Sequence, residues 1–241
     1  MPIETQLTAK IEPFDTFWEA PENIEKGYGS FGKFYKRNYF KYLPEDKNAS
    51  LLVISCGPGY FINLANTEGY SNALGIDSDS EKVEYAKRRA LNCKTANAFP
   101  FLESNEKRFD AIFVEQEINH LTKEEILIFL KLCRDSLKNN GTLIVHSLNG
   151  ANPLTGSEAL AQNFDHYNTF TEYSLRQILQ YSKFQEIKVF PLILYVFYEN
   201  PLNYLGLFAD AVINFIFRLG FIFYGKENRF FSKKIAAVCK K

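Results

Sequence analysis

The chain has 241 residues, of which 46% are hydrophobic and 23% are charged, and its 28 basic residues balance its 28 acidic residues. This composition excludes a wholly disordered chain and suits one large α/β domain with additions. A formal net charge of +0 provides no overall attraction to nucleic acid, so we expect no nucleic-acid partner.

The cysteines and the first residues indicate where the protein works. Cys56, Cys93, Cys133 and Cys239 are scattered, without a C-x-x-C pair or a histidine at zinc-ligand spacing. Neither a disulfide framework nor a zinc site is therefore expected. The first residues lack the basic and apolar segments of a secretory signal, so we expect a cytoplasmic protein.

Residues 1–45 are predicted to form an irregular arm followed by a helix. Apolar residues recur at helical spacing from Phe31 to Leu43, whereas prolines and glycines interrupt the segment before them. The helix either covers a site at the edge of a sheet as a lid or simply packs on the sheet. Its candidates for contact with a ligand, each of which also suits a solvated helix face, are Tyr28, Lys33 and Arg37.

Residues 51–60 form an apolar run that ends in a glycine turn containing Gly57 and Gly59. Glycines lack the Cβ that keeps a ligand away from the backbone, and the following helix would direct its N–H groups to the same place. A second short strand, 73–77, ends in Asp77, about 20 residues after the first glycine, where a carboxylate can bind a ribose diol. This spacing indicates a nucleotide ligand.

Strands and helices alternate from residue 51 to residue 147. The other predicted strands are 94–98, 109–114 and 142–146. The predicted helices are 61–66, one opened by a capping box of Ser78 and Glu81, and one opened by Thr122 and Glu125 and ended by Asn140 and Gly141. Such alternation requires a parallel sheet with a ligand site at the carboxyl ends of its strands.

The pattern becomes less regular after residue 147. A long loop is predicted at 148–170, a helix opens at Thr171, and strands are predicted at 187–190 and 234–239. Loops of this length in a compact domain are usually functional or disordered.

Residues 202–225 form an apolar segment that is long enough at first sight to span a membrane. Asp210, Asn214 and Arg218 recur along it every four residues as a polar stripe, and the closing strand should return to the same sheet, which a single span would prevent. A basic cluster suited to anionic lipid follows at Lys226, Arg229, Lys233 and Lys234. The sequence leaves open a helix on a membrane surface, a helix buried against the domain or in a homodimer, and a true span.

The motifs discriminate between two classes of nucleotide-binding enzyme. A nicotinamide fingerprint requires a third glycine where this chain has Ile62. The chain instead resembles the class I S-adenosylmethionine-dependent methyltransferases over about residues 50–190 and the last strand. The motifs that carry the resemblance are Ile54 to Gly59, Gly75 to Asp77, Ala96 to Phe99, Phe109 to Phe113, and Leu137 to Val145.

The resemblance implies a Rossmann-like doubly wound α/β fold with a mostly parallel seven-stranded sheet and an antiparallel last strand. It implies S-adenosyl-L-methionine as cofactor and a methyltransferase domain at 46–200 and 230–241, with an apolar helical insertion at 201–229. The implied cofactor-binding residues are Ser55, Cys56, Gly57, Gly59, Tyr60, Asp77, Ser78, Asn97, Ala98, Glu115 and Gln116.

Three positions depart from the family pattern. Val53 stands where the family commonly has an acid, Ser55 where it has glycine, and Asn97 where it has aspartate at the adenine amino group. The carbonyl oxygen of Asn97 can still accept a hydrogen bond. Val53 is harder to compensate, because an acid there would help to order the loop. The alternative hypothesis is therefore a cofactor-binding or interaction module that has lost turnover.

Two of the three histidines are candidates for a general base. His120 follows the strand that ends at 114, where some relatives bind a metal through E-x-x-E-H; the matching positions here are the amides Gln116 and Asn119, so no metal is expected. A loop-orienting role for His120 is the alternative to catalysis. His146 lies within a predicted strand and is interpreted as a core residue.

His166 is the sharper candidate, although a surface histidine without a role is its alternative. The segments Asn149 to Pro153 and Phe164 to Thr171 resemble a branch of the family found with surface-polysaccharide synthesis, in which this loop faces the acceptor. Asp165 either orients the imidazole or caps a turn. The resemblance predicts O-methylation of a sugar or of a polysaccharide or lipid-linked glycan precursor; a third possibility is methylation of a small molecule such as a quinone or lipid.

Overall fold

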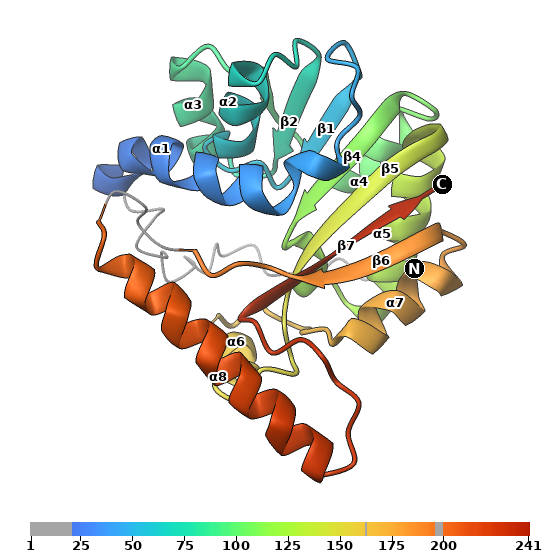
Figure 1. The fold of residues 1–241 in the computed structure, drawn as a ribbon. Coiled ribbons are helices and arrows are strands. Elements are labelled where there is room, and N and C mark those ends of the chain that lie inside the picture. The colour runs from blue at the N-terminus through green and yellow to red at the C-terminus, as the bar shows by residue number, and fades with distance from the viewer. Residues whose placement is uncertain (1–20, 162, 196–199) are drawn as a thin grey trace.

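The structure, a computed structural model, describes residues 21–161, 163–195 and 200–241. Seven strands form one sheet in the order β3-β2-β1-β4-β5-β7-β6, with helices on both faces (Figure 1). The strands are β1 (Leu51–Ile54), β2 (Ala73–Asp77), β3 (Cys93–Thr95), β4 (Phe109–Glu115), β5 (Leu137–Leu148), β6 (Gln185–Pro191) and β7 (Lys234–Lys240). β1 to β5 pair in parallel, and β7 is antiparallel to both β5 and β6, which confirms the predicted fold.

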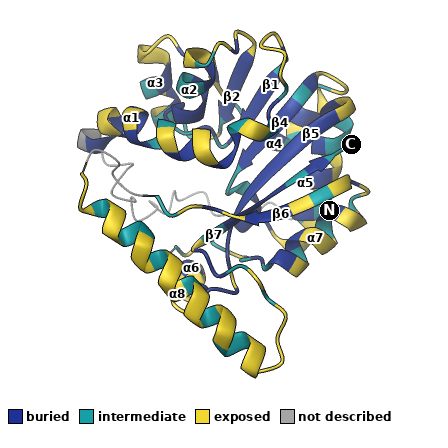
Figure 2. Cartoon of the chain, in the orientation of Figure 1, coloured by how far each residue is buried: buried dark blue, intermediate teal, exposed yellow. Residues whose placement is uncertain are grey.

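Two apolar cores hold the helices against the sheet. One joins α1, α2 and α3 to one face, and the other joins α4, α5 and α7 to the opposite face. The helical elements are α1 (Pro21–Asn38), η1 (Phe40–Tyr42), α2 (Tyr60–Thr67), α3 (Ser80–Arg88), α4 (Ala98–Glu103), η2 (Glu117–Asn119), α5 (Lys123–Ser136), α6 (Glu158–Ala161), α7 (Glu172–Tyr181) and α8 (Asn203–Phe223). The strands at the centre of the sheet are buried on both faces, whereas α8 is exposed (Figure 2).

The helix predicted from Phe31 begins ten residues earlier, at Pro21, and the first twenty residues of the predicted arm lie outside the described residues. Gly27 lies inside α1 because the helix crosses α2 closely; a Cβ on Gly27 would come within 2.4 Å of the Tyr60 hydroxyl oxygen. Tyr28, Phe34 and Tyr35 of α1 are buried in the core. The prediction of an irregular segment was therefore wrong for residues 21–30, since glycine there serves helix packing.

Two helix boundaries also differ from the prediction. α3 is capped by Asp79, whose side chain accepts hydrogen bonds from the N–H groups of Glu81 and Lys82, so Ser78 is not the cap. The capping box of Thr122 at the start of α5 is confirmed. α5 ends at Ser136, four residues before Asn140, because the chain has already joined β5 and pairs with β4.

The strand predicted at 94–98 is shorter in the structure, where β3 covers only Cys93–Thr95. The strand ends at Thr95, and Asn97 caps the unpredicted short helix α4 by accepting a hydrogen bond from the N–H of Phe99 at 3.0 Å.

Gly75 tests how closely the glycine turn sits on β2. A Cβ there would come within 2.8 Å of the Cys56 sulfur and 2.9 Å of the Cys93 sulfur. We expect Gly75→Ala to lower the free energy of unfolding by about 1–3 kcal/mol, because overpacking forces these buried neighbours apart. Gly206→Ala is the matched control, since nothing lies within 4 Å of that position in α8. Equal urea midpoints for both variants and the wild type would contradict the prediction.

Candidate active site

The carboxyl ends of the central strands open into a cleft of about 920 Å³, and a smaller cavity of about 230 Å³ shares part of its wall. The predicted cofactor residues that line the cleft are Ser55, Cys56, Gly57, Tyr60, Asp77, Ser78, Glu115 and Gln116. Asn97 and Ala98 line the smaller cavity. Ten of the eleven predicted residues are thus brought together, and Gly59 is the exception.

A single carboxylate shapes the glycine turn. Asp77, at the end of β2, accepts hydrogen bonds from the N–H of Gly57 and the N–H of Asp79, each at 2.8 Å. Gly57 has a φ of +51°, and a Cβ on it would meet nothing within 4 Å, so its backbone faces open space. Gly59 has a φ of +84°, and its missing Cβ makes room for Leu91 and Ala86. Gly57 therefore serves the cleft, whereas Gly59 serves packing.

Asp77 has acceptor capacity left for a ligand. Burial raises the pKa of Asp77, and its hydrogen bonds from the N–H groups of Asp79 and Gly57 oppose that rise. Each carboxylate oxygen holds one N–H and can accept a further hydrogen bond. A diol placed in the cleft could therefore bind here.

A tyrosine of α1 stabilises the glycine turn. The hydroxyl of Tyr28 donates a hydrogen bond to the carbonyl of Pro58 in the glycine turn at 2.6 Å. Val53, in the strand before the turn, is fully buried in the apolar core. Ordering of the loop, which an acid at position 53 would assist, is thus supplied by α1. Lys33 and Arg37 are exposed and lie outside the residues that line the cleft.

Tyr35 was missed by the sequence analysis. Its hydroxyl donates to both carboxylate oxygens of Glu115, at 2.8 and 2.9 Å, and Glu115 lies at the end of β4 in the cleft wall. Burial, and then the nearby Glu115 carboxylate, raise the pKa of Tyr35 well above its ordinary value, so this hydroxyl stays a donor. The only signal in the sequence is a tyrosine on the apolar face of a helix, which packing alone explains equally well.

Ser55 holds a strained backbone conformation next to a second missed residue. Its φ is +58°, where glycine is favoured, and its hydroxyl donates to the Glu117 carboxylate. Burial raises the pKa of Glu117, and the Ser55 hydrogen bond opposes the rise. This hydrogen bond joins the turn after β1 to η2 and forms one side of the smaller cavity.

The smaller cavity suits a flat aromatic ring. Its apolar walls come from Ile76, Ala98, Phe99 and Leu121, which lie at the ends of β2, β3 and β4. Asn97 reaches its rim, although its carbonyl oxygen already accepts the cap hydrogen bond from Phe99. An amide oxygen can accept twice, so the predicted adenine contact is compatible with the cap.

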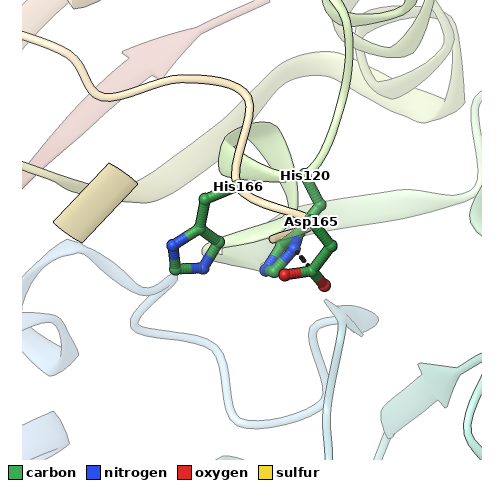
Figure 3. A group of neighbouring side chains, drawn as sticks. All are labelled: His120, Asp165 and His166. Atoms are coloured by element: carbon green, nitrogen blue, oxygen red, sulfur yellow. Dashed lines mark hydrogen bonds and ion pairs between the residues drawn. The ribbon is translucent and has the colours of Figure 1, made fainter. Parts of the chain in front are cut away.

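The two candidate histidines lie side by side in the cleft, with their ring centroids 4.7 Å apart (Figure 3). His120 Nδ1 lies 3.0 Å from Asp165 Oδ2, and His166 Nδ1 lies 2.6 Å from the carbonyl oxygen of Ala159. Both partners can only accept, so each Nδ1 carries the proton and each Nε2 holds a lone pair when the ring is neutral. Asp165 therefore orients His120 rather than His166, whose orientation was one of the two roles that the sequence left open for Asp165.

The same three side chains are able to hold a metal. One ligand atom from each of His120, Asp165 and His166 lies within 4.8 Å of the others. Two imidazoles and a carboxylate suit Zn²⁺, Mn²⁺ or Fe²⁺. Asn119, in contrast, is fully buried, and its amide nitrogen donates hydrogen bonds to the carbonyl of Asn168 and the hydroxyl of Ser147. The absence of a bound metal stays a prediction.

His146 is a buried residue in the wall of the cleft. It lies in β5 and is only 1% exposed, as expected for a core residue. Burial lowers its pKa well below the ordinary value, and Lys234 lowers it further, so the ring is neutral. Its Nδ1 lies 3.8 Å from Glu115, too far for a hydrogen bond.

Glu117 gives a pH test of the site. Glu117→Gln keeps an acceptor for Ser55 but removes a buried charge. Because the pKa of Glu117 is raised in the folded protein, protonation of its carboxyl group stabilises the fold. This stabilisation is fully present below the ordinary pKa of 4.5 and is lost as pH rises through the raised pKa. We expect the variant to exceed the wild type in free energy of unfolding at neutral pH, and the difference to disappear in acid.

Urea unfolding at a series of pH values measures this difference. Glu103→Gln, at an exposed position at the end of α4, is the matched control and should follow the wild type. A stability difference for Glu117→Gln that does not change with pH would contradict the assignment.

Comparisons with known proteins agree with this geometry. Residues 51–141 match the family described as a methyltransferase domain. The fold is similar to that of an S-adenosylmethionine-dependent methyltransferase from Archaeoglobus fulgidus, with a TM-score of 0.66 and 21% identity over 90% of this chain and 98% of that one. It is also similar to a possible histamine N-methyltransferase from Thermotoga maritima, with a TM-score of 0.62 and 15% identity over 93% and 97% of the two chains.

A third similar structure is phosphoethanolamine N-methyltransferase 2 of Haemonchus contortus in complex with S-adenosylmethionine, with a TM-score of 0.60 and 14% identity over 93% of this chain and 59% of that chain. At these identities the structures establish the shared fold. The fold and the matched domain together support a class I methyltransferase with S-adenosylmethionine as its cofactor.

Proposed function

We propose that the protein transfers a methyl group from S-adenosylmethionine to a hydroxyl of a sugar, in a polysaccharide or lipid-linked glycan precursor at the cytoplasmic face of a membrane. The observation that carries the proposal is the pair of imidazoles that line the same cleft as the glycine turn. One of them is held in position by a carboxylate, which suits it to act as a general base for a hydroxyl.

The described residues fit the cofactor. Gly57 leaves open space for close approach, Asp77 retains acceptors for a ribose diol, and the smaller cavity suits adenine. Glu115 places a carboxylate, fixed by Tyr35, at the end of β4, where a cationic amino group would be favoured. These four features lie along one continuous wall formed by the ends of β1, β2 and β4.

The bound cofactor supplies a methyl group on a sulfonium, and the protein must align the acceptor hydroxyl and remove its proton. We assign proton removal to His120 Nε2, because the Asp165 carboxylate holds the opposite nitrogen and stabilises the imidazolium that forms. His166 is assigned to positioning the hydroxyl. It lies against the same ring but is fixed by the carbonyl oxygen of Ala159 rather than by a charge.

Several groups that line the cleft suit a sugar acceptor. Carboxylates and an amide that can bind hydroxyls come from Glu158, Asp165 and Asn163. Tyr195 also lines the cleft and stacks on Phe31 of α1 with ring centroids 4.5 Å apart, which offers an aromatic surface to an apolar sugar face. The resemblance of the 149–171 loop to the polysaccharide branch supports the same class of acceptor.

Asp77 tests the cofactor assignment. Asp77→Ala removes the proposed diol acceptor and its hydrogen bonds from the N–H groups of Gly57 and Asp79, so we expect the affinity for S-adenosylhomocysteine to fall at least about tenfold. Calorimetry measures the affinity, and Asp46→Ala, in an exposed turn before β1, is the matched control. Unchanged affinity in Asp77→Ala would refute the assignment, and no binding by the wild type would refute the enzyme.

The histidines test the chemistry. We expect His120→Gln to lower kcat by about 10²–10⁴-fold with unchanged binding of S-adenosylhomocysteine, because proton removal is lost. Asp165→Asn should lower kcat less and shift its pH profile, since it acts through His120. His166→Gln should mainly raise KM for the acceptor. The assay follows labelled methyl transfer into cell-envelope glycan and lipid fractions.

Each outcome of this assay selects among the hypotheses. Transfer into the glycan fraction that needs His120 supports the proposal, whereas transfer only into quinones or free lipids supports the small-molecule alternative. Tight cofactor binding without transfer into any fraction supports a module that has lost turnover. Loss of transfer on chelation, restored by a divalent metal, would reassign His120, Asp165 and His166 as metal ligands.

A further inference from the structure

α8 presents its apolar side to the outside of the molecule. The helix has 21 residues, an 18-residue window within it has a mean hydropathy of 1.8, and none of its residues is buried. In Figures 1 and 2 it lies away from the sheet, beyond α6, and is largely exposed. Its large exposed apolar residues are Tyr204, Leu205, Phe208, Val212, Ile213, Phe215, Ile216, Leu219, Ile222 and Phe223.

Two polar residues of α8 face the protein instead. Asp210 and Asn214 are half-buried, and burial raises the pKa of Asp210. Half-buried Phe217 and Phe221 on the same side contact Phe231 of the segment before β7, with ring centroids 6.2 and 4.5 Å away. This is the reverse of a water-exposed helix, which buries its apolar side. The predicted polar stripe therefore faces inward at Asp210 and Asn214, whereas its third member, Arg218, is exposed.

The surroundings of α8 exclude a single membrane span. β6, before the helix, and β7, after it, are adjacent antiparallel strands of one sheet. A helix of 21 residues is roughly 31 Å long, so crossing a bilayer once would leave β7 on the opposite side from β6. Both ends of α8 must therefore stay on the side of the domain.

The width of the apolar surface favours lipid over a second copy of the chain. At 100° per residue, the exposed apolar positions cover roughly 200° of the helix circumference. A partner helix buries a narrow seam, whereas a bilayer surrounds the whole outward side of a helix. Arg218 lies at the border of this surface and is exposed, so its side chain can extend to lipid headgroups.

Charge indicates the kind of lipid. Four basic residues and one acidic residue lie between 226 and 234, directly after the helix. Arg229 lies 3.9 Å from Glu172, which leaves Lys226 and Lys233 exposed on this return segment. An excess of basic charge beside an apolar helix attracts an anionic bilayer.

We infer that α8 lies flat in the surface of an anionic bilayer, with Phe208, Phe215 and Ile222 directed into the acyl region and Asp210 and Asn214 against the domain. This attachment does not depend on the identity of the methyl acceptor. It also places the acceptor loop near the membrane, because Asn149 and Asn152 donate hydrogen bonds to carbonyls of residues 230–232, the segment that Phe231 joins to α8.

The first test is flotation of the full chain with vesicles of phosphatidylcholine, alone or mixed with phosphatidylglycerol. We expect the wild type to float with the anionic vesicles and Phe208→Gln/Phe215→Gln to bind about 100-fold more weakly, since two large apolar side chains no longer enter lipid. The matched control is Ile128→Gln/Tyr181→Gln, which changes two exposed apolar residues on α5 and α7. Unchanged thermal unfolding verifies that each double variant folds.

The second test measures orientation. Trp18 is the one tryptophan, so in a Trp18→Phe background Phe215→Trp and Phe217→Trp report on the two sides of α8. Brominated lipids should quench the outward Trp strongly and the inward one weakly. Equal quenching, absence of vesicle binding, or equal loss of binding in both double variants would overturn the inference. A lipid-free dimer that Phe208→Gln/Phe215→Gln dissociates would assign the surface to a second copy and overturn it as well.

Discussion

The Asp77 carboxylate is the constraint on which the site depends. It joins the turn after β1 to the turn after β2 through the N–H groups of Gly57 and Asp79, before any ligand arrives. The arrangement requires Gly75, because a Cβ there would collide with Cys56 and lift the glycine turn away from the sheet. Burial opposes the ionisation that a diol acceptor needs, and those N–H hydrogen bonds favour it. Thus the sheet, rather than the ligand, determines the shape of the cleft.

The tyrosines of α1 show why the departures at Val53 and Ser55 were misleading when considered alone. An acid at position 53 would order the glycine turn from within β1. Here Tyr28 of α1, 30 residues away in sequence from Pro58, orders the turn through its hydrogen bond to the Pro58 carbonyl. Ser55 keeps a left-handed conformation because its hydroxyl is bonded to Glu117, 62 residues away. A motif compares residues at fixed local positions and has no access to such partners. Compensation for a lost motif residue must therefore be sought in the tertiary structure.

The sheet and most of the cofactor wall were predictable because both follow from local rules. Apolar runs that end in Gly57 and Asp77 determine strands and their carboxyl ends, and parallel pairing then brings those ends together. The errors occurred where tertiary contacts decide: the early start of α1 depends on the packing of Gly27 against Tyr60, and α5 ends early because of pairing with β4. Likewise, the loop geometry determines that Asp165 contacts His120 rather than His166, and residue spacing does not encode that geometry.

The inverted orientation of α8 connects these observations to the proposed function. Asn149 and Asn152, interpreted from sequence as markers of an acceptor loop, use their side-chain amides to hold the return segment 230–232. Phe231 in that segment packs on α8, so the helix and the loop that bears His166 are mechanically joined. On the proposed function, a lipid-linked acceptor is confined to the same surface as α8. The contacts that attach the enzyme to a bilayer would then also hold the acceptor loop in place for the histidines.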